Sequence, residues 1–92
     1  MALYNGDVKS ATATSNTAVI DGPARVRSMY YTANASAGSI VLKNGGSGGT
    51  TMVTINVPAN AYGPIYIPGD GVRFETNVYT VLTNVSSVTV FY

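Results

Sequence analysis

Residues 50–58, Thr-Thr-Met-Val-Thr-Ile-Asn-Val-Pro, carry the clearest structural signal in this chain. In this stretch apolar Val53, Ile55 and Val57 alternate with polar residues, and Pro58 follows directly. Successive side chains of a β-strand point to opposite faces, so the alternation predicts a strand with one face toward a core. Because proline lacks a backbone N–H, we expect the strand to end at Val57.

Similar signals recur along the rest of the chain, where β-branched and aromatic residues are interrupted by Gly, Pro and Asn. No segment has a sustained 3.6-residue apolar period with capping residues; the Ala content of residues 33–39 leaves a short helix there as an alternative. Pro64 and Pro68 flank Ile65–Ile67 and predict that this strand lies at a sheet edge. The remaining predicted strands are Val8–Thr14, Thr17–Asp21, Arg25–Thr32, Ile40–Lys43, Val72–Glu75, Tyr79–Asn84 and Val88–Tyr92.

This succession of short strands predicts an all-β fold. We expect residues 1–92 to form a single small domain, an antiparallel β-sandwich or jelly roll of about eight strands. Residues 1–7 precede the first predicted strand, and a further hypothesis makes them an N-terminal arm. Leu3 and Tyr4 would then be its apolar anchors on a neighbouring subunit.

The composition favours contacts with other proteins. Charged residues make up 10% of the chain, against about 25% in ordinary globular proteins. The net charge of +1 gives no general attraction to nucleic acid or membranes, so neither is an expected partner. This small chain has no cysteine and therefore no disulfide. Small folds without disulfides often gain stability by forming oligomers. The first residues lack the basic flank and apolar run of a secretory signal, which predicts synthesis in a cytoplasm without signal-dependent export.

The sequence also lacks the residues on which most enzymes depend. It contains no histidine and no cysteine, so a serine nucleophile would have no imidazole partner. The side-chain carboxylates are those of Asp7, Asp21, Asp70 and Glu75, too few and too scattered to predict a catalytic pair or a metal site. The glycine-rich residues 44–49 lack the Gly-Lys-[Ser/Thr] ending of a phosphate-binding loop. We therefore expect no enzymatic activity, no cofactor, no metal and no small-molecule substrate.

Two groups of side chains are candidates for an interface. Arg25 and Arg27 alternate with an apolar residue, and Met29 and Tyr31 continue the same face if Arg25–Thr32 is one strand. Arg, Tyr and Met are enriched in protein interfaces, so these four residues form a candidate anchor patch. The alternative is a solvated sheet face with Glu75 as a nearby counter-charge.

Tyrosines form the second group. Tyr62 and Tyr66 lie in a stretch rich in proline and glycine and are expected to be exposed, where they would pack on a protein or stack on sugar rings. Tyr30 and Tyr31 are adjacent and should point to opposite faces, with one of them in the core.

Several segments together carry a family resemblance. They are Gly-Pro-Ala-Arg-Val-Arg-Ser-Met-Tyr-Tyr (22–31), Ile-Val-Leu-Lys-Asn-Gly (40–45), Gly-Gly-Thr-Thr-Met-Val-Thr-Ile-Asn-Val-Pro-Ala (48–59), Ile-Pro-Gly-Asp-Gly-Val-Arg-Phe (67–74) and Ser-Val-Thr-Val-Phe-Tyr (87–92). In this order they resemble short β-sandwich virion proteins of tailed bacteriophages, several of which are decoration or cement proteins of the head. The resemblance covers about three quarters of the chain, as its first and last segments show.

The resemblance implies a homotrimer on the capsid surface that binds the major capsid protein and bridges neighbouring subunits. It thus implies a virion location after synthesis in the host cytoplasm. Two other functions stay open at this point. One is a component of the tail, fibre or neck of the virion, and the other is a carbohydrate-binding β-sandwich module with Tyr62 or Tyr66 in a shallow groove.

Overall fold

The computed structural model describes residues 9–69 and 71–92, which form ten β-strands and, within these residues, no helix. Every strand pair is antiparallel. The hypothetical arm over residues 1–7, with Leu3 and Tyr4, lies outside the described residues. The strands are β1 (Ser10–Ala13), β2 (Thr17–Ile20), β3 (Ala24–Val26), β4 (Ser28–Ala33), β5 (Gly38–Asn44), β6 (Thr50–Val57), β7 (Tyr62–Tyr66), β8 (Val72–Phe74), β9 (Val78–Thr83) and β10 (Val85–Phe91).

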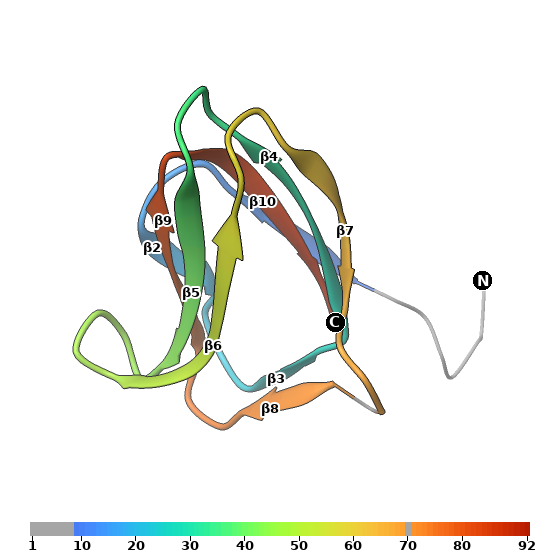
Figure 1. Ribbon diagram of the computed structural model, residues 1–92. Helices are drawn as coiled ribbons and strands as arrows, with labels where there is room; N and C mark the ends of the chain where they lie inside the picture. The colour runs from blue at the N-terminus through green and yellow to red at the C-terminus, as the bar shows by residue number, and fades with distance from the viewer. Residues whose placement is uncertain (1–8, 70) are drawn as a thin grey trace.

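Two four-stranded sheets pack face to face, as Figure 1 shows. Sheet A has the strand order β1-β10-β4-β7, and sheet B has the order β2-β9-β5-β6. The remaining strands, β3 and β8, pair with each other and form a two-stranded ribbon across one end of the sandwich (Figure 1). The prediction of an all-β sandwich is therefore confirmed, with ten strands in place of about eight.

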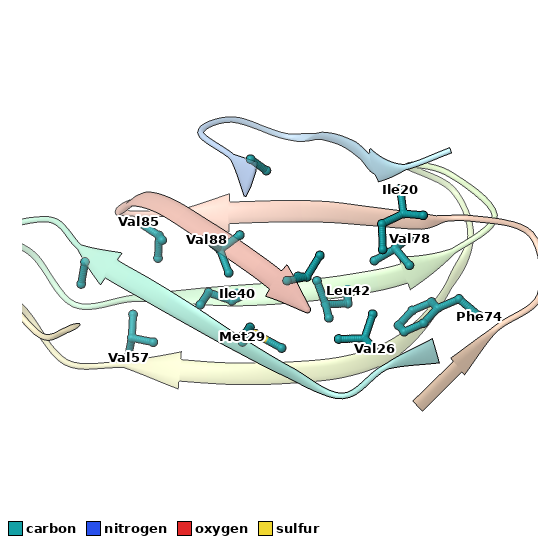
Figure 2. Packing of buried hydrophobic residues seen from close by; sticks show 13 residues of the cluster. Ile20, Val26, Met29, Ile40, Leu42, Val57, Phe74, Val78, Val85 and Val88 are labelled. Carbon is teal, nitrogen blue, oxygen red and sulfur yellow. The ribbon is translucent and has the colours of Figure 1, made fainter. Parts of the chain in front are cut away.

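The core lies between the two sheets and under the ribbon. Met29 and Val88 of sheet A lie opposite Ile40 and Leu42 of sheet B (Figure 2). These four side chains and Val90 of sheet A each have an exposed fraction of 0%. The β3–β8 ribbon covers the end of the core that lies beneath it and adds two fully buried side chains of its own. They are Val26 and Phe74.

Strand β6 matches its prediction residue for residue, since it runs from Thr50 to Val57 and Pro58 follows it. Inward-facing Val53 and Ile55 are partly buried and pack on the core, and Val57 is buried. The alternation in the sequence thus corresponds to one covered and one exposed face of the strand.

The predicted strand Arg25–Thr32 is wrong as a single element, because the structure divides it at Arg27. Val26 still pairs in the ribbon, with Val72, whereas Ser28 already pairs in sheet A. The backbone of Arg27 makes the corner: its N–H donates to the carbonyl of Phe91 at 2.9 Å, and its carbonyl accepts from Ile67 N–H at 3.1 Å. One segment therefore serves two different sheets.

The alternative of a short helix over residues 33–39 is also wrong. Ala33 ends β4 and Gly38 begins β5, so the intervening residues form a tight connection between neighbouring layers. The backbones come so close at Gly38 that a Cβ atom there would overlap the carbonyl of Thr83. Glycine is required at this position by the close approach.

Two asparagine amides fix the glycine-rich connection between β5 and β6. The Oδ1 atom of Asn44 accepts from the backbone N–H groups of Thr76 at 2.8 Å and Asn77 at 3.4 Å. In return, Asn77 Oδ1 accepts from the N–H groups of Gly45 at 3.0 Å and Gly46 at 3.1 Å. This loop is thereby tied to the turn before β9, a contact that the spacing of its glycines did not predict.

Candidate interaction surface

The outer face of sheet A is the candidate functional surface. Along β4, Met29 and Ala33 are buried while Tyr30 is exposed, and the other strands of the sheet alternate in the same way. Residues directly opposite each other in antiparallel strands share a face, so the strand register defines the outer surface. We call it the tyrosine face; its residues are Ser10, Thr12, Ser28, Tyr30, Thr32, Tyr62, Pro64, Tyr66, Ser87, Thr89 and Phe91.

The aromatic side chains of this face gather at the β7 edge. Tyr30 lies directly opposite Pro64, and Tyr62 and Tyr66 flank that proline two residues away on the same side of β7. At about 3.3 Å per residue, the two flanking tyrosines are roughly 13 Å apart along the strand. The three tyrosines thus occupy positions on three sides of Pro64 on one face of the sheet, and we call these four residues the aromatic patch.

The patch is open to solvent. Tyr62 is 73% exposed, Tyr66 is 78% exposed and Tyr30 is 44% exposed. Strand β7 is an edge strand of sheet A, so it has a neighbouring strand, β4, on one side only, and no further strand lies beside its tyrosines at the outer edge. Pro64, which has no N–H to donate, suits this edge position, and the predicted edge location of the strand is confirmed.

No residue of the tyrosine face carries a charge. Apart from Phe91, the rest of the face is made of serine and threonine. The hydroxyls of Thr12 and Thr89 form a hydrogen bond with each other across β1 and β10 at 2.8 Å. Charge is found elsewhere: Arg25 and Arg73 lie on the ribbon, and Arg27 lies at the corner beside it. An uncharged sheet with exposed aromatic rings can pack on another uncharged surface without leaving a charge desolvated.

The predicted patch of Arg25, Arg27, Met29 and Tyr31 does not exist as one surface. Met29 has an exposed fraction of 0% and belongs to the core, and Tyr31 is partly buried against it. Both arginines are exposed. The prediction is wrong because Arg27 interrupts the strand: the alternation restarts at Ser28, which places Met29 on the inner face.

The expectation that Tyr62 and Tyr66 are exposed is confirmed. Tyr30 is a third member of the surface that the sequence did not single out. Its neighbour Tyr31 packs on the core, so the two rings do point to opposite faces, but adjacency alone did not tell which ring is outward.

Residues 9–69 and 71–92 contain no group of three or more His, Cys, Asp or Glu side chains that could hold a metal ion. Within the same ranges there is no helix of the length and apolarity needed to cross a bilayer. No protein-family model, curated protein or solved structure matches the chain.

Proposed function

We propose that this protein is a non-enzymatic structural protein of a virion, which binds the outer surface of the capsid and stabilises contacts between major capsid subunits. The observation that supports this proposal most directly is the tyrosine face, an uncharged sheet surface with three exposed tyrosines. The resemblance to phage decoration proteins supports a location on the head, and the uncharged, exposed character of this face supports a contact with another protein.

The chemistry of the tyrosine face suits a protein partner. Tyrosine has a large apolar body and a hydroxyl that forms hydrogen bonds, and it loses little conformational entropy when it is fixed. For this reason tyrosines are frequent among the residues that dominate binding energy. Tyr30, Tyr62 and Tyr66 are the expected centre of the interface, with the surrounding serine and threonine hydroxyls at its rim.

The mechanism needs only rigid contact. A sandwich whose sheets are held by a continuous core presents the tyrosine face with little loss of order on binding. Each bound copy adds contact area at a subunit junction, so the pressure of packaged DNA must break more contacts before the shell opens. A homotrimer at such a junction would triple the area and is the expected oligomeric state.

Cosedimentation with purified capsid shells tests the proposal. The double variant Tyr62→Ser/Tyr66→Ser should bind shells at least about tenfold more weakly, because both rings leave the contact. Its melting temperature should be nearly unchanged, since both side chains are exposed in the isolated chain. Met52→Ser is the control, because Met52 is 40% exposed on β6 of the other sheet. Unchanged binding by the double variant would contradict the role of this face.

The oligomeric state from light scattering and the copy number per virion together distinguish a location on the head from one in the tail, fibre or neck. A capsid decoration protein should be a trimer in solution and should be present in virions in numbers comparable with the capsid protein. A tail, fibre or neck component should be present in few copies per particle. A trimer at low copy number would move the proposal from the head to the tail.

The exposure of Tyr62 and Tyr66 also favours a second candidate, a carbohydrate-binding module. Tyrosine rings stack on the apolar faces of sugars, and such platforms bind glycans weakly. Isothermal titration with soluble glycans tests this function: saturable binding that Tyr62→Ser abolishes would support it. A protein that binds shells and shows no saturable heat with glycans is a capsid ligand alone.

A further inference from the structure

The ribbon at the end of the sandwich places two arginines side by side. Strands β3 and β8 pair so that Arg25 is directly opposite Arg73. The neighbouring positions of the ribbon face inward, where Val26 and Phe74 have exposed fractions of 0%. The ribbon itself lies across one end of the sandwich (Figure 1). Both arginines on it are exposed, so its outer face carries two guanidinium groups.

Such a pair is unfavourable unless it has a partner. The Cβ atoms of directly opposite residues are only about 4.5–5.5 Å apart, and like charges in this arrangement destabilise a sheet. Each guanidinium presents five N–H donors. Among the described residues no arginine side chain donates a hydrogen bond to another protein group. An anion between the two groups would relieve the repulsion and accept several of these hydrogen bonds.

The same two side chains line a pocket. Its walls are formed by Arg25 and Arg73 together with Pro23, Ala24 and Phe74, and its volume is about 210 Å³. Sites for drug-sized ligands and cofactors usually measure about 300–1,000 Å³. The pocket is thus too small for an organic cofactor, but it is large enough for a single carboxylate or phosphate group.

We propose that Arg25 and Arg73 form an oxyanion-binding site on the β3–β8 ribbon. Its ligand is one carboxylate or phosphate group, because planar guanidinium forks match the paired oxygens of both. The group can come from a free phosphate ion or from an acidic side chain of a partner protein. The chain's low net charge argues for one bound group instead of a polyanion. This site does not depend on the function proposed for the tyrosine face.

Nuclear magnetic resonance of the arginine Nε–Hε groups in the full-length protein tests the site. Two probes are titrated at constant ionic strength: inorganic phosphate, and N-acetyl-glutamic acid amide, whose only charge is its side-chain carboxylate. At least one probe should shift the Arg25 and Arg73 signals together and reach saturation. Arg73→Gln and Arg25→Gln should each weaken this binding by at least about tenfold, since one charged fork is lost.

Lys9→Gln is the matched control, because it removes the same charge from an exposed residue outside the pocket. It should leave the binding unchanged, and backbone amide spectra verify that every variant is folded. Saturation with phosphate alone identifies a free anion as the ligand, whereas saturation with the glutamate derivative identifies a protein carboxylate. The proposal is overturned if neither probe saturates, or if Lys9→Gln weakens binding as much as Arg73→Gln does.

Discussion

Two methionines have opposite environments in this fold, and they allow a paired test. Met29 has an exposed fraction of 0% between the sheets, whereas Met52 is 40% exposed. Met29→Ala should lower the free energy of unfolding by about 2–5 kcal/mol, because it removes buried apolar atoms and leaves a cavity. Met52→Ala should change it by less than about 0.5 kcal/mol. Urea denaturation measures both free energies. Equally small effects of the two substitutions would contradict the burial of Met29 and would instead agree with the sequence-based prediction that Met29 lies on the surface.

The amide pair of Asn44 and Asn77 gives a second prediction for a single residue. Asn77 Oδ1 accepts two backbone N–H groups of the glycine-rich loop, and alanine would remove this acceptor. Asn77→Ala should lower the free energy of unfolding by about 1 kcal/mol, since water can replace part of what is lost.

Asn56→Ala provides the comparison, because Asn56 lies exposed on the outer face of β6 and no described hydrogen bond involves its side chain. Chemical denaturation should give Asn56→Ala nearly the same free energy of unfolding as the original protein. Hydrogen exchange gives a local measure as well: the amides of Gly45 and Gly46 should exchange faster in Asn77→Ala. Unchanged exchange at both amides would contradict the anchoring of this loop.

For secondary-structure elements, prediction from sequence succeeded where a signal is local. Strand β6 was found with its true ends because alternation and Pro58 lie within nine consecutive residues, 50–58. The corner at Arg27 was missed because no glycine or proline marks it; it results from hydrogen bonds to Phe91 and Ile67, which are distant in sequence. The pairing of Arg25 with Arg73 was missed for the same reason. The two strands are distant in sequence, and nothing in either segment alone indicates which residues will lie opposite each other.

The β3–β8 ribbon yields a prediction for an element. Arg73→Glu would place a carboxylate opposite Arg25 and turn a repulsive cross-strand pair into an attractive one. It should raise the free energy of unfolding by about 0.2–1 kcal/mol at low salt, with a smaller gain at high salt. A double-mutant cycle with Arg25→Gln isolates the pair, because the gain should vanish when Arg25 is absent. A gain that persists in Arg25→Gln would show that Arg73 is repelled by another group.

At the scale of the whole molecule, uncharged and charged surfaces meet at one corner. The row Ser28, Tyr66 and Phe91 ends the tyrosine face next to Arg27, and Arg27 connects this face to the ribbon. A partner that covers sheet A can therefore reach toward the arginines as well. The two surfaces would contribute differently: apolar burial on the tyrosine face gives affinity, and charges at its end give orientation.

This division predicts how binding to capsid shells depends on salt. Apolar contacts are not screened by ions, whereas exposed charge pairs are largely screened once the Debye length falls from about 10 Å at 0.1 M toward 3 Å at 1 M. If the tyrosine face dominates, the affinity measured by cosedimentation should change by less than about threefold between 0.1 M and 0.5 M sodium chloride. Arg73→Gln should leave this profile unchanged, while Tyr62→Ser/Tyr66→Ser should lower the affinity at every salt concentration. A steep loss of binding with salt, removed by Arg73→Gln, would instead make the arginine ribbon the main contact with the shell.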